Sequence, residues 1–471
     1  MMRPPKNGEA EVVRRLLAIL AGGALLIWPA FLNGYPLLFS DSGAFLAQTV
    51  VPLMIWDKPW IYGPFAWLFH QHISLWGTVI AQGVMLSHLL WLLARVLGRA
   101  TPGGHLALCC GLALLTTAPW SAAMVMPDIL TPMAVLAAAL LGWGWAALGR
   151  GERLWLLLLG SVATASHLSN LPVMLALLVL GGLLRLGWRR CLAVAGPLLG
   201  AMALLLGTNL SGHGRLALSP YGSTFLLARL IADGPGARTI AAACPEAGWY
   251  LCAFAGRLPA DANDFLWQPD SPVNRTPEGA AIFLGGAVLA PEASAIIAET
   301  LRREPVGVLR AGLTNFLRQM TQTGIGDTLS AHLLDVTVRP RLAEGFPGFE
   351  VAAYDAALQQ GEGLGLAARR IGWLHPLALL LSLPFLAWGW RRAQAAGDAR
   401  MRGLLLCLLV GLTANALAAG ALSGVHDRYQ ARVAWLLPLA AWLAWHIGAY
   451  GRAQAASEGL AQSGRRPRKP S

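Results

Sequence analysis

The sequence predicts an all-α polytopic membrane protein with about ten transmembrane helices and a mostly helical domain inserted between spans seven and eight. Hydrophobic residues make up 56% of the 471 residues and charged residues 13%, a composition too apolar for soluble domains. Apolar runs of about 20 residues, the length that crosses a bilayer, recur along the chain. One long interval of ordinary polar composition, residues 210–370, interrupts them.

Seven predicted spans precede the polar interval and three follow it. They cover residues 16–35, 73–97, 105–120, 129–148, 154–167, 171–186, 191–209, 371–390, 403–422 and 433–450. The fifth and sixth are short and are separated only by SHLSNLP, so we interpret them as a tight hairpin. A single broken helix packed inside the protein is the alternative.

The spans divide the chain into five parts. These are an amino-terminal tail (1–15), a membrane module of seven spans (16–209) with a long first outer loop (33–72), the inserted domain (210–370), a second membrane module (371–450) and a carboxy-terminal tail (451–471). The last part is predicted to be a disordered basic tail near anionic lipid. Within the inserted domain, PEASAIIAETLRRE and PVGVLRAGLTNFLRQM show helical spacing of apolar residues, and Pro305 suits a helix start.

The net charge of +12 is explained by membrane orientation. Of the 36 Lys and Arg residues, 20 lie in the two tails and in alternate short loops, whereas the opposite short loops hold three: Lys58, Arg428 and Arg432. The positive-inside rule then places both termini in the cytoplasm, and the first long loop and the inserted domain on the outer side. We expect a multi-pass protein of a bacterial-type inner membrane, in contact with membrane lipids and without a nucleic-acid partner.

The six cysteines fall into two classes. Four lie within spans, where they behave as small apolar residues. Cys244 and Cys252 lie outside, in ACPEAGWYLC, and can form a disulfide if that compartment is oxidising. Pairing also requires a geometry that the sequence does not reveal, so a disulfide and two free thiols both stay open.

Acidic residues at the edges of apolar helices are the first candidates for function. Asp41 follows the first span directly, and Asp128 stands at the start of the fourth. A carboxylate at such a depth is costly and by default indicates a functional site. Asp57, next to Lys58 in WDKPW, is better explained as a structural ion pair. The aromatic residues of this loop, Trp56 among them, predict one or two short helices in the headgroup layer.

The second candidate is the segment SGVHDRYQARVAWLLP, at the outer entry to the tenth span. Arg428 and Arg432 are four residues apart and would share a helix face, and the planar guanidinium suits phosphate. His426 and Tyr429 add further donors. The alternatives are a structural pair, such as Asp427 with an arginine, or side chains that extend to the interface.

Motifs for metals and nucleotides are missing from the sequence. The outward histidines 70, 72, 167 and 375 are scattered, and no HExxH, CxxC or EF-hand pattern occurs. There is no DxD pair around Asp41, no P-loop and no GxGxxG after a strand. We therefore expect no cofactor and no divalent metal.

This combination of features resembles the GT-C superfamily of integral-membrane glycosyltransferases. These enzymes use polyprenyl-phosphate sugars and include the protein mannosyltransferases and the aminoarabinose transferase of lipid A. The resemblance covers the membrane part, residues 16–209 and 371–450. It implies that Asp41 is the catalytic acid of the first loop and Asp128 the acid of the second, with Arg428 and Tyr429 near the donor phosphate. The acid pair of the metal-dependent oligosaccharyltransferases is absent, and the inserted domain matches no module that we can name.

The implied reaction also follows from the chemistry of the residues. Transfer from a lipid phosphate needs a base for the acceptor hydroxyl and cations for the departing phosphate. Asp41 would be the base of an inverting displacement, assisted by Asp128. Arg428 would hold phosphate, with Arg432 or Lys58 beside it and His426 and Tyr429 nearby; sugar and acceptor stay unknown.

Two other classes of function stay open at this stage. In a transporter or flippase for an anionic lipid or solute, the same charged residues would form a proton relay and a substrate clamp. A noncatalytic assembly protein would tolerate Asp41→Asn. Transporters often show repeated halves, and no repeat is visible here, which favours the enzyme.

Overall fold

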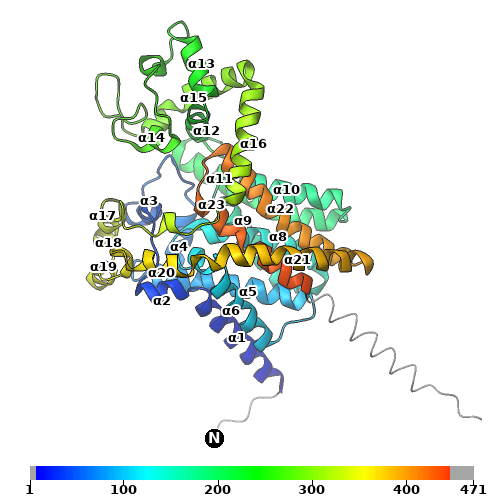
Figure 1. Ribbon diagram of the computed structural model, residues 1–471. Helices are drawn as coiled ribbons and strands as arrows, with labels where there is room; N and C mark the ends of the chain where they lie inside the picture. Colours follow the sequence, from blue (N-terminus) through cyan, green and yellow to red (C-terminus); the bar gives the residue numbers. More distant parts are fainter. Residues whose placement is uncertain (1–6, 446–471) are drawn as a thin grey trace, which may run out of the picture.

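The computed structural model describes residues 7–445, and within that range it contains helices and no strands. Figure 1 shows a bundle of helices with a second, smaller group of helices above it. The first residues of the predicted amino-terminal tail, the end of the tenth span and the predicted basic tail at 451–471 lie outside the described residues. The predicted all-α class is confirmed for the part that the structure describes.

The first group of helices corresponds to the predicted seven-span module. It contains α1 (Asn7–Leu25), α2 (Trp28–Asn33), α3 (Ser40–Val50), α4 (Tyr62–His70), α5 (Trp76–Val96), α6 (Pro102–Leu115), α7 (Ala118–Ala122), η1 (Pro127–Ile129), α8 (Leu130–Trp143), η2 (Trp145–Ala147), α9 (Arg150–Ala165), α10 (Asn170–Leu183) and α11 (Trp188–His213). The first predicted span is broken into α1 and α2. Pro29 stands at the start of α2, where its missing N–H costs no helical hydrogen bond.

Among the described residues, four helical stretches are long and apolar enough to cross a membrane. They are Trp76–Val96, Trp188–His213, Gly363–Ala395 and Ala399–Leu422. The other predicted spans contain shorter helices such as α6, α8 and α10. These features support a helical protein associated with a membrane, whereas ten complete spans stay a prediction.

Helix α8 is the centre of the bundle. Every residue from Leu130 to Trp143 is buried, and α8 packs against α5, α9, α10, α11 and α22. Such burial suits a helix that is apolar on all sides. Because η1 leads directly into α8, Asp128 in η1 is held at the amino-terminal end of a helix that is buried along its whole length.

The inserted interval 210–370 contributes to two separate cores. Helices α12 (Gly222–Ala232), α13 (Pro235–Ala243), η3 (Tyr250–Phe254), α14 (Ala262–Trp267), α15 (Gly285–Arg303) and α16 (Pro305–Thr321) follow one another in the first part. All but α16 contribute buried side chains to an apolar cluster of their own, which includes Leu227, Phe265 and Ile296. Cys244 and Cys252 form a disulfide within this upper group of helices.

The second part of the interval returns to the bundle. It contains η4 (Gly326–Thr328), α17 (Leu334–Thr337), α18 (Arg339–Gly345), α19 (Gly348–Asp355), η5 (Leu358–Gln360) and α20 (Gly363–Gly372). Leu334, Leu342 and Leu364 are buried in the same apolar cluster as α8. This part therefore packs with the first outer loop and the bundle, and not with the upper group.

The chain ends with α21 (Leu374–Ala395), α22 (Ala399–Leu422) and α23 (Asp427–Ala434), and it is helical again at residues 436–445. The first loop contains short helices, α3 and α4, as predicted, and their place in a headgroup layer stays a prediction. Trp56 of this loop contacts the upper group of helices. Its ring packs at 5.2 Å from Phe225 and 5.8 Å from Trp267, measured between centroids. Trp56 therefore connects the first loop to the upper group.

Candidate active site

The two segments that lead to the predicted acids Asp41 and Asp128 are joined by backbone hydrogen bonding. The N–H of Val125 donates to the Leu37 carbonyl at 2.9 Å, and the two segments form a parallel bridge. Ser42 Oγ donates to the carbonyl of Val125 at 2.9 Å. Asp41 follows Leu37 by four residues, and Asp128 follows Val125 by three. The segments that carry Asp41 and Asp128, which are distant in the sequence, are thus anchored to each other.

Two buried side chains from the second part of the inserted interval hold the first loop in place. The Gln359 amide accepts from the Leu38 N–H at 3.0 Å and donates to the Leu38 carbonyl at 2.6 Å. Glu350 Oε1 accepts from the Tyr35 hydroxyl at 2.7 Å and from the Leu75 N–H at 2.8 Å. Buried polar groups that lose such partners are destabilising, so these contacts fix the approach to Asp41. The sequence had indicated neither residue.

Asp41 lies between two cations. Its Oδ1 is 3.1 Å from Lys58 Nζ, and its Oδ2 accepts from both terminal nitrogens of Arg428 at 3.1 Å. Lys58 also pairs with Asp57 at 2.5 Å. The side chains of Asp41, Lys58 and Arg428 are 28%, 13% and 16% exposed. We call these three residues the open triad, because solvent still reaches each of them.

All three members of the open triad are charged near neutral pH. Burial alone raises the pKa of the Asp41 carboxyl, but Lys58 and Arg428 outweigh it and hold that pKa well below its usual range. Burial likewise opposes the charge on Lys58, and the carboxylates of Asp41 and Asp57 raise the pKa of its ammonium group above the usual value. Asp41 also lies in the first turn of α3, where the helix dipole favours an anion.

Arg432 and Asp128 form a second ion pair, which is sealed. The guanidinium of Arg432 donates to Asn415 Oδ1 at 2.9 Å, to Ser169 Oγ at 3.0 Å and to Asp128 Oδ1 at 3.5 Å. The side chains of Arg432 and Asp128 are 0% and 7% exposed. We call Arg432 and Asp128 the sealed pair. A phosphate could contact Arg432 only by displacing these partners. Arg432 is therefore buried behind the open triad and is not accessible to a ligand.

A small hollow connects the open triad with the sealed pair. Its volume is about 20 Å³, enough for about one water molecule. It is lined by Trp120, Ser121, Met124, Asp128, Gly324, Ile325, Thr328, Arg428 and Ala431. One residue of each ion pair therefore borders the same space.

Asp327 is a carboxylate near this hollow that sequence reasoning missed. Its Oδ2 accepts the backbone N–H of Arg428 at 3.1 Å. The pKa of the Asp327 carboxyl is raised to about 6. Desolvation by the neighbouring protein is the largest cause, Asp427 and Asp128 add to it, and Arg428 opposes it. Part of the side chain still reaches solvent. The only signal in the sequence is an acid in a glycine-rich turn, TGIGDT, and that pattern is common in surface loops.

Tyr429 lies between the two arginines of α23. Its hydroxyl accepts from Arg428 Nη2 at 3.2 Å, and the Arg432 guanidinium carbon is 5.2 Å from its ring centroid. The His426 ring packs edge-on against the same ring at 5.4 Å. Burial lowers the pKa of His426, so this imidazole is neutral near pH 7 and serves as packing behind Tyr429.

His167 approaches Tyr429 from the turn between α9 and α10, with ring centroids 5.9 Å apart. Because Ser169 Oγ accepts from Arg432, its hydroxyl proton is free to be donated to His167 Nδ1 at 2.7 Å. The assigned tautomer of a neutral His167 then carries its proton on Nε2. A polar chain thus extends from the sealed pair toward the α9–α10 turn, which the structure resolves as two helices joined by a tight turn.

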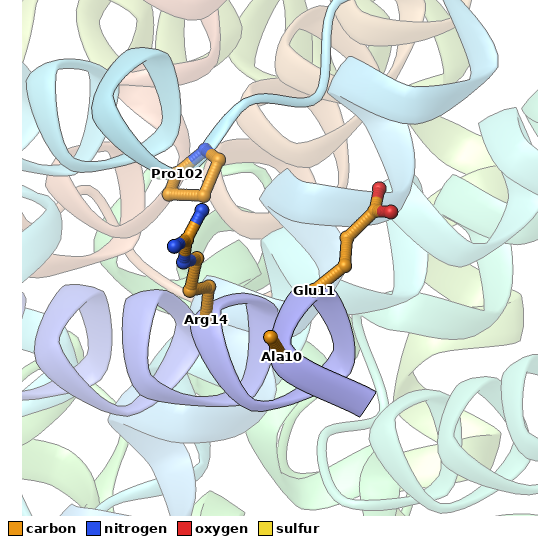
Figure 2. A pocket seen from close by; sticks show the side chains of 4 residues that line it. All are labelled: Ala10, Glu11, Arg14 and Pro102. Carbon is orange, nitrogen blue, oxygen red and sulfur yellow. The ribbon is translucent and has the colours of Figure 1, made fainter. Parts of the chain in front are cut away.

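A second hollow lies on another part of the protein, between α1 and the start of α6. Figure 2 shows its lining of Ala10, Glu11, Arg14 and Pro102. Arg14 points toward Pro102, while the Glu11 carboxylate turns away from it. The lining offers no convergent set of donors, so we assign no chemistry to it. Within residues 7–445, no three His, Cys, Asp or Glu side chains are arranged to hold a metal ion.

Comparisons with models of protein families, with curated proteins and with solved structures found no match for this chain.

Proposed function

We propose that the protein is an integral-membrane glycosyltransferase of the GT-C type. It transfers a sugar from a polyprenyl-phosphate donor to an acceptor on the outer face of the membrane, and the acceptor is a glycan, a lipid or a protein of the cell envelope. The observation that carries the proposal is the open triad: an ionised, partly exposed carboxylate beside two cations, where the first loop meets the entry to the last helical segment. These are the base and the anion-binding groups that the transfer requires.

The reaction is a single displacement at the anomeric carbon. Asp41 accepts the proton of the acceptor hydroxyl as the acceptor oxygen forms its bond to that carbon. The bond from the anomeric carbon to the phosphate oxygen breaks on the opposite face, so the configuration is inverted. The electron pair remains on the departing polyprenyl phosphate, whose growing negative charge is stabilised by Arg428 and Lys58.

Donor binding would also strengthen the base. Without a donor, Asp41 is held by two cations and is therefore a weak proton acceptor. A phosphate that attracts Arg428 and Lys58 weakens their hold on Asp41, and the pKa of its carboxyl then rises toward the range useful for general base catalysis. Proton abstraction is thereby coupled to the presence of the donor.

The sealed pair has a positioning role in this reaction. Asp128 borders the hollow beside Arg428, in a position to orient the acceptor. Arg432 pairs with Asp128 and fixes α23 to Asn415 of α22. We therefore assign Arg432 a supporting role, with Tyr429 packing against Arg428 and His426 packing behind Tyr429.

The proposal is tested by sugar transfer in purified membranes with a labelled polyprenyl-phosphate sugar. Arg428→Ala should raise the donor concentration needed for half-maximal transfer by more than tenfold, because a charge-assisted contact to phosphate is lost. The matched control is Arg257→Ala, which removes an exposed arginine from the upper group. Unchanged donor dependence in Arg428→Ala would refute the assignment of the phosphate site.

A further inference from the structure

Helix α16 leaves the upper group of helices and packs along α22. In Figure 1 it connects α12 and α15 with the bundle. The Cβ of a residue at position 312 would lie 3.6 Å from Cβ of Ala421, and a Cβ at Gly420 would approach the Asn315 carbonyl oxygen to 2.7 Å. Glycine at 420 thus allows the two backbones to touch.

The closest contacts are with the carboxy-terminal end of α22. A Cβ at position 420 would lie 3.2 Å from Cβ of Gln319, in the last turn of α16. Next to it, the side-chain amide of Gln430 donates to Met320 Sδ at 3.9 Å and to the Leu412 carbonyl at 3.4 Å.

This packing sets the depth of α16 relative to a membrane. Helix α22 has 24 residues and is about 36 Å long, only slightly more than the ~30 Å hydrocarbon core of a bilayer. With α22 across the bilayer, its last turn lies at the edge of the hydrocarbon core. The last turn of α16, which touches it at position 420, then lies in the interfacial layer.

The free face of α16 has the composition that such a position requires. Val306, Leu309, Leu313 and Leu317 are each more than half exposed, in a stripe at helical spacing. The opposite face buries Asn315 and Gln319. The apolar stripe is accompanied by exposed Leu417 and Leu422 on α22, so both helices present leucines to the surroundings.

A basic stripe runs beside the apolar one. Arg310 and Arg318 are exposed, eight residues apart, and follow Leu309 and Leu317 directly in the sequence. Apolar side chains beside arginines are typical of helices that lie in the interface of an anionic membrane. Long arginine side chains reach from that depth to lipid phosphates.

We propose that α16 is an interfacial helix that binds an anionic phospholipid surface. Its leucines contact acyl chains, and Arg310 and Arg318 contact headgroup phosphates. The helix thereby fixes the upper group against the bilayer beside the open triad, since Gln319 at its end donates to the His426 carbonyl at 2.8 Å and accepts from the His426 N–H at 3.0 Å. This inference does not depend on the proposed enzymatic function.

Depth-dependent fluorescence quenching tests the apolar half of the proposal. A fluorophore is attached to Leu313→Cys, and in the control to Val288→Cys, an exposed position on α15. The full-length proteins are placed in nanodiscs of phosphatidylcholine and phosphatidylglycerol, and the signal of the unsubstituted protein is subtracted. Bromine atoms on the acyl chains should quench the label at 313 several-fold more than the label at 288, and aqueous iodide should show the reverse order.

Two results overturn this half. If iodide quenches both labels equally, α16 lies in water. If the label at 313 is shielded from both quenchers, another protein or a second copy of this chain covers the face.

Lipid selectivity tests the basic half. The double variant Arg310→Gln/Arg318→Gln should lose preference for spin-labelled phosphatidylglycerol over phosphatidylcholine, by about fivefold for each arginine that contacts the surface. Arg257→Gln is the matched control and should keep the preference of the unsubstituted protein. An unchanged preference in the double variant would refute the contact with headgroup phosphates.

Discussion

The open triad and the sealed pair use similar residues one helical turn apart, yet their surroundings differ. Arg428 and Arg432 both lie on α23, and each pairs with one of the two predicted acids. Solvent reaches the first pairing, whereas the second is buried, and its Arg432 also donates to Asn415 of α22 and to Ser169 just before α10. Carboxylate and guanidinium chemistry alone therefore does not distinguish a reactive site from a supporting one.

The difference in burial sets what each ion pair can do. A buried pair is costly to break, since removal of one partner leaves an uncompensated charge. A partly exposed pair contributes little to stability and can exchange its partners with water or a ligand. We therefore expect changes in the sealed pair to affect folding first and changes in the open triad to affect activity first.

The largest effect on stability is expected from Arg432→Ala. This change leaves the buried carboxylate of Asp128 unpaired and removes the donors to Asn415 and Ser169, so the free energy of unfolding should fall by about 3–5 kcal/mol. Arg428→Ala should lower it by about 1 kcal/mol or less. Unfolding of both variants in mixed detergent micelles checks the comparison. Equal losses in the free energy of unfolding would show that the two ion pairs contribute equally to stability, contrary to this account.

Asp128→Asn should affect both stability and activity, because this residue belongs to the sealed pair and also borders the hollow. The amide keeps the shape of the side chain but weakens the contact with Arg432, at a cost of about 1–3 kcal/mol. Sugar transfer should fall as well. A variant with normal transfer would restrict Asp128 to a structural role.

The pH dependence of transfer should report Asp327. Because its pKa is raised to about 6, the carboxyl is protonated below that pH and no longer holds the Arg428 backbone as an ionised acceptor. Transfer should rise with pH through about 6, with a slope of about tenfold per unit on the acid side. Asp327→Asn should remove this limb from the profile of kcat/KM, which reports the free enzyme, in which the pKa of Asp41 is low. A limb that persists in Asp327→Asn would contradict the assignment.

The smallest effect on stability is expected from Lys58→Gln. Its ion pairs with Asp41 and Asp57 are within reach of solvent, so we expect a loss of about 1 kcal/mol or less. Donor affinity should still fall, since Lys58 is one of two cations proposed to bind phosphate. The two measurements, unfolding and donor dependence, should thus separate clearly for this residue. A loss of stability as large as that of Arg432→Ala would place Lys58 with the sealed pair.

The helical class and the main candidates of the site could be predicted from local features of the sequence. Apolar run lengths predict helices, and the cost of a carboxylate at a membrane edge singles out Asp41 and Asp128. The four-residue spacing of Arg428 and Arg432 predicts a shared helix face, as α23 has it. Each of these inferences needs only residues that are close in the chain.

The remaining features depend on contacts between distant segments. Gln359 meets Leu38 across 321 positions, and Glu350 meets Tyr35 across 315, and no local pattern predicts such pairings. The sequence indicated Lys58 as the ion-pair partner of Asp57 and as a candidate phosphate ligand, but not as a partner of Asp41, because the loop that turns it toward Asp41 has no periodic pattern. Burial, which distinguishes Arg432 from Arg428, appears only after the helices have packed.

The central claim is that Asp41 is the base of a transfer reaction in the open triad. It is tested most directly by sugar transfer from a polyprenyl-phosphate donor in Asp41→Asn, with Asp270→Asn, an exposed acid of the upper group, as the matched control. We predict that Asp41→Asn remains in the membrane with nearly unchanged unfolding but loses at least about a hundredfold in transfer rate, while Asp270→Asn is unaffected. Transfer at the unsubstituted rate in a folded Asp41→Asn protein would contradict the account.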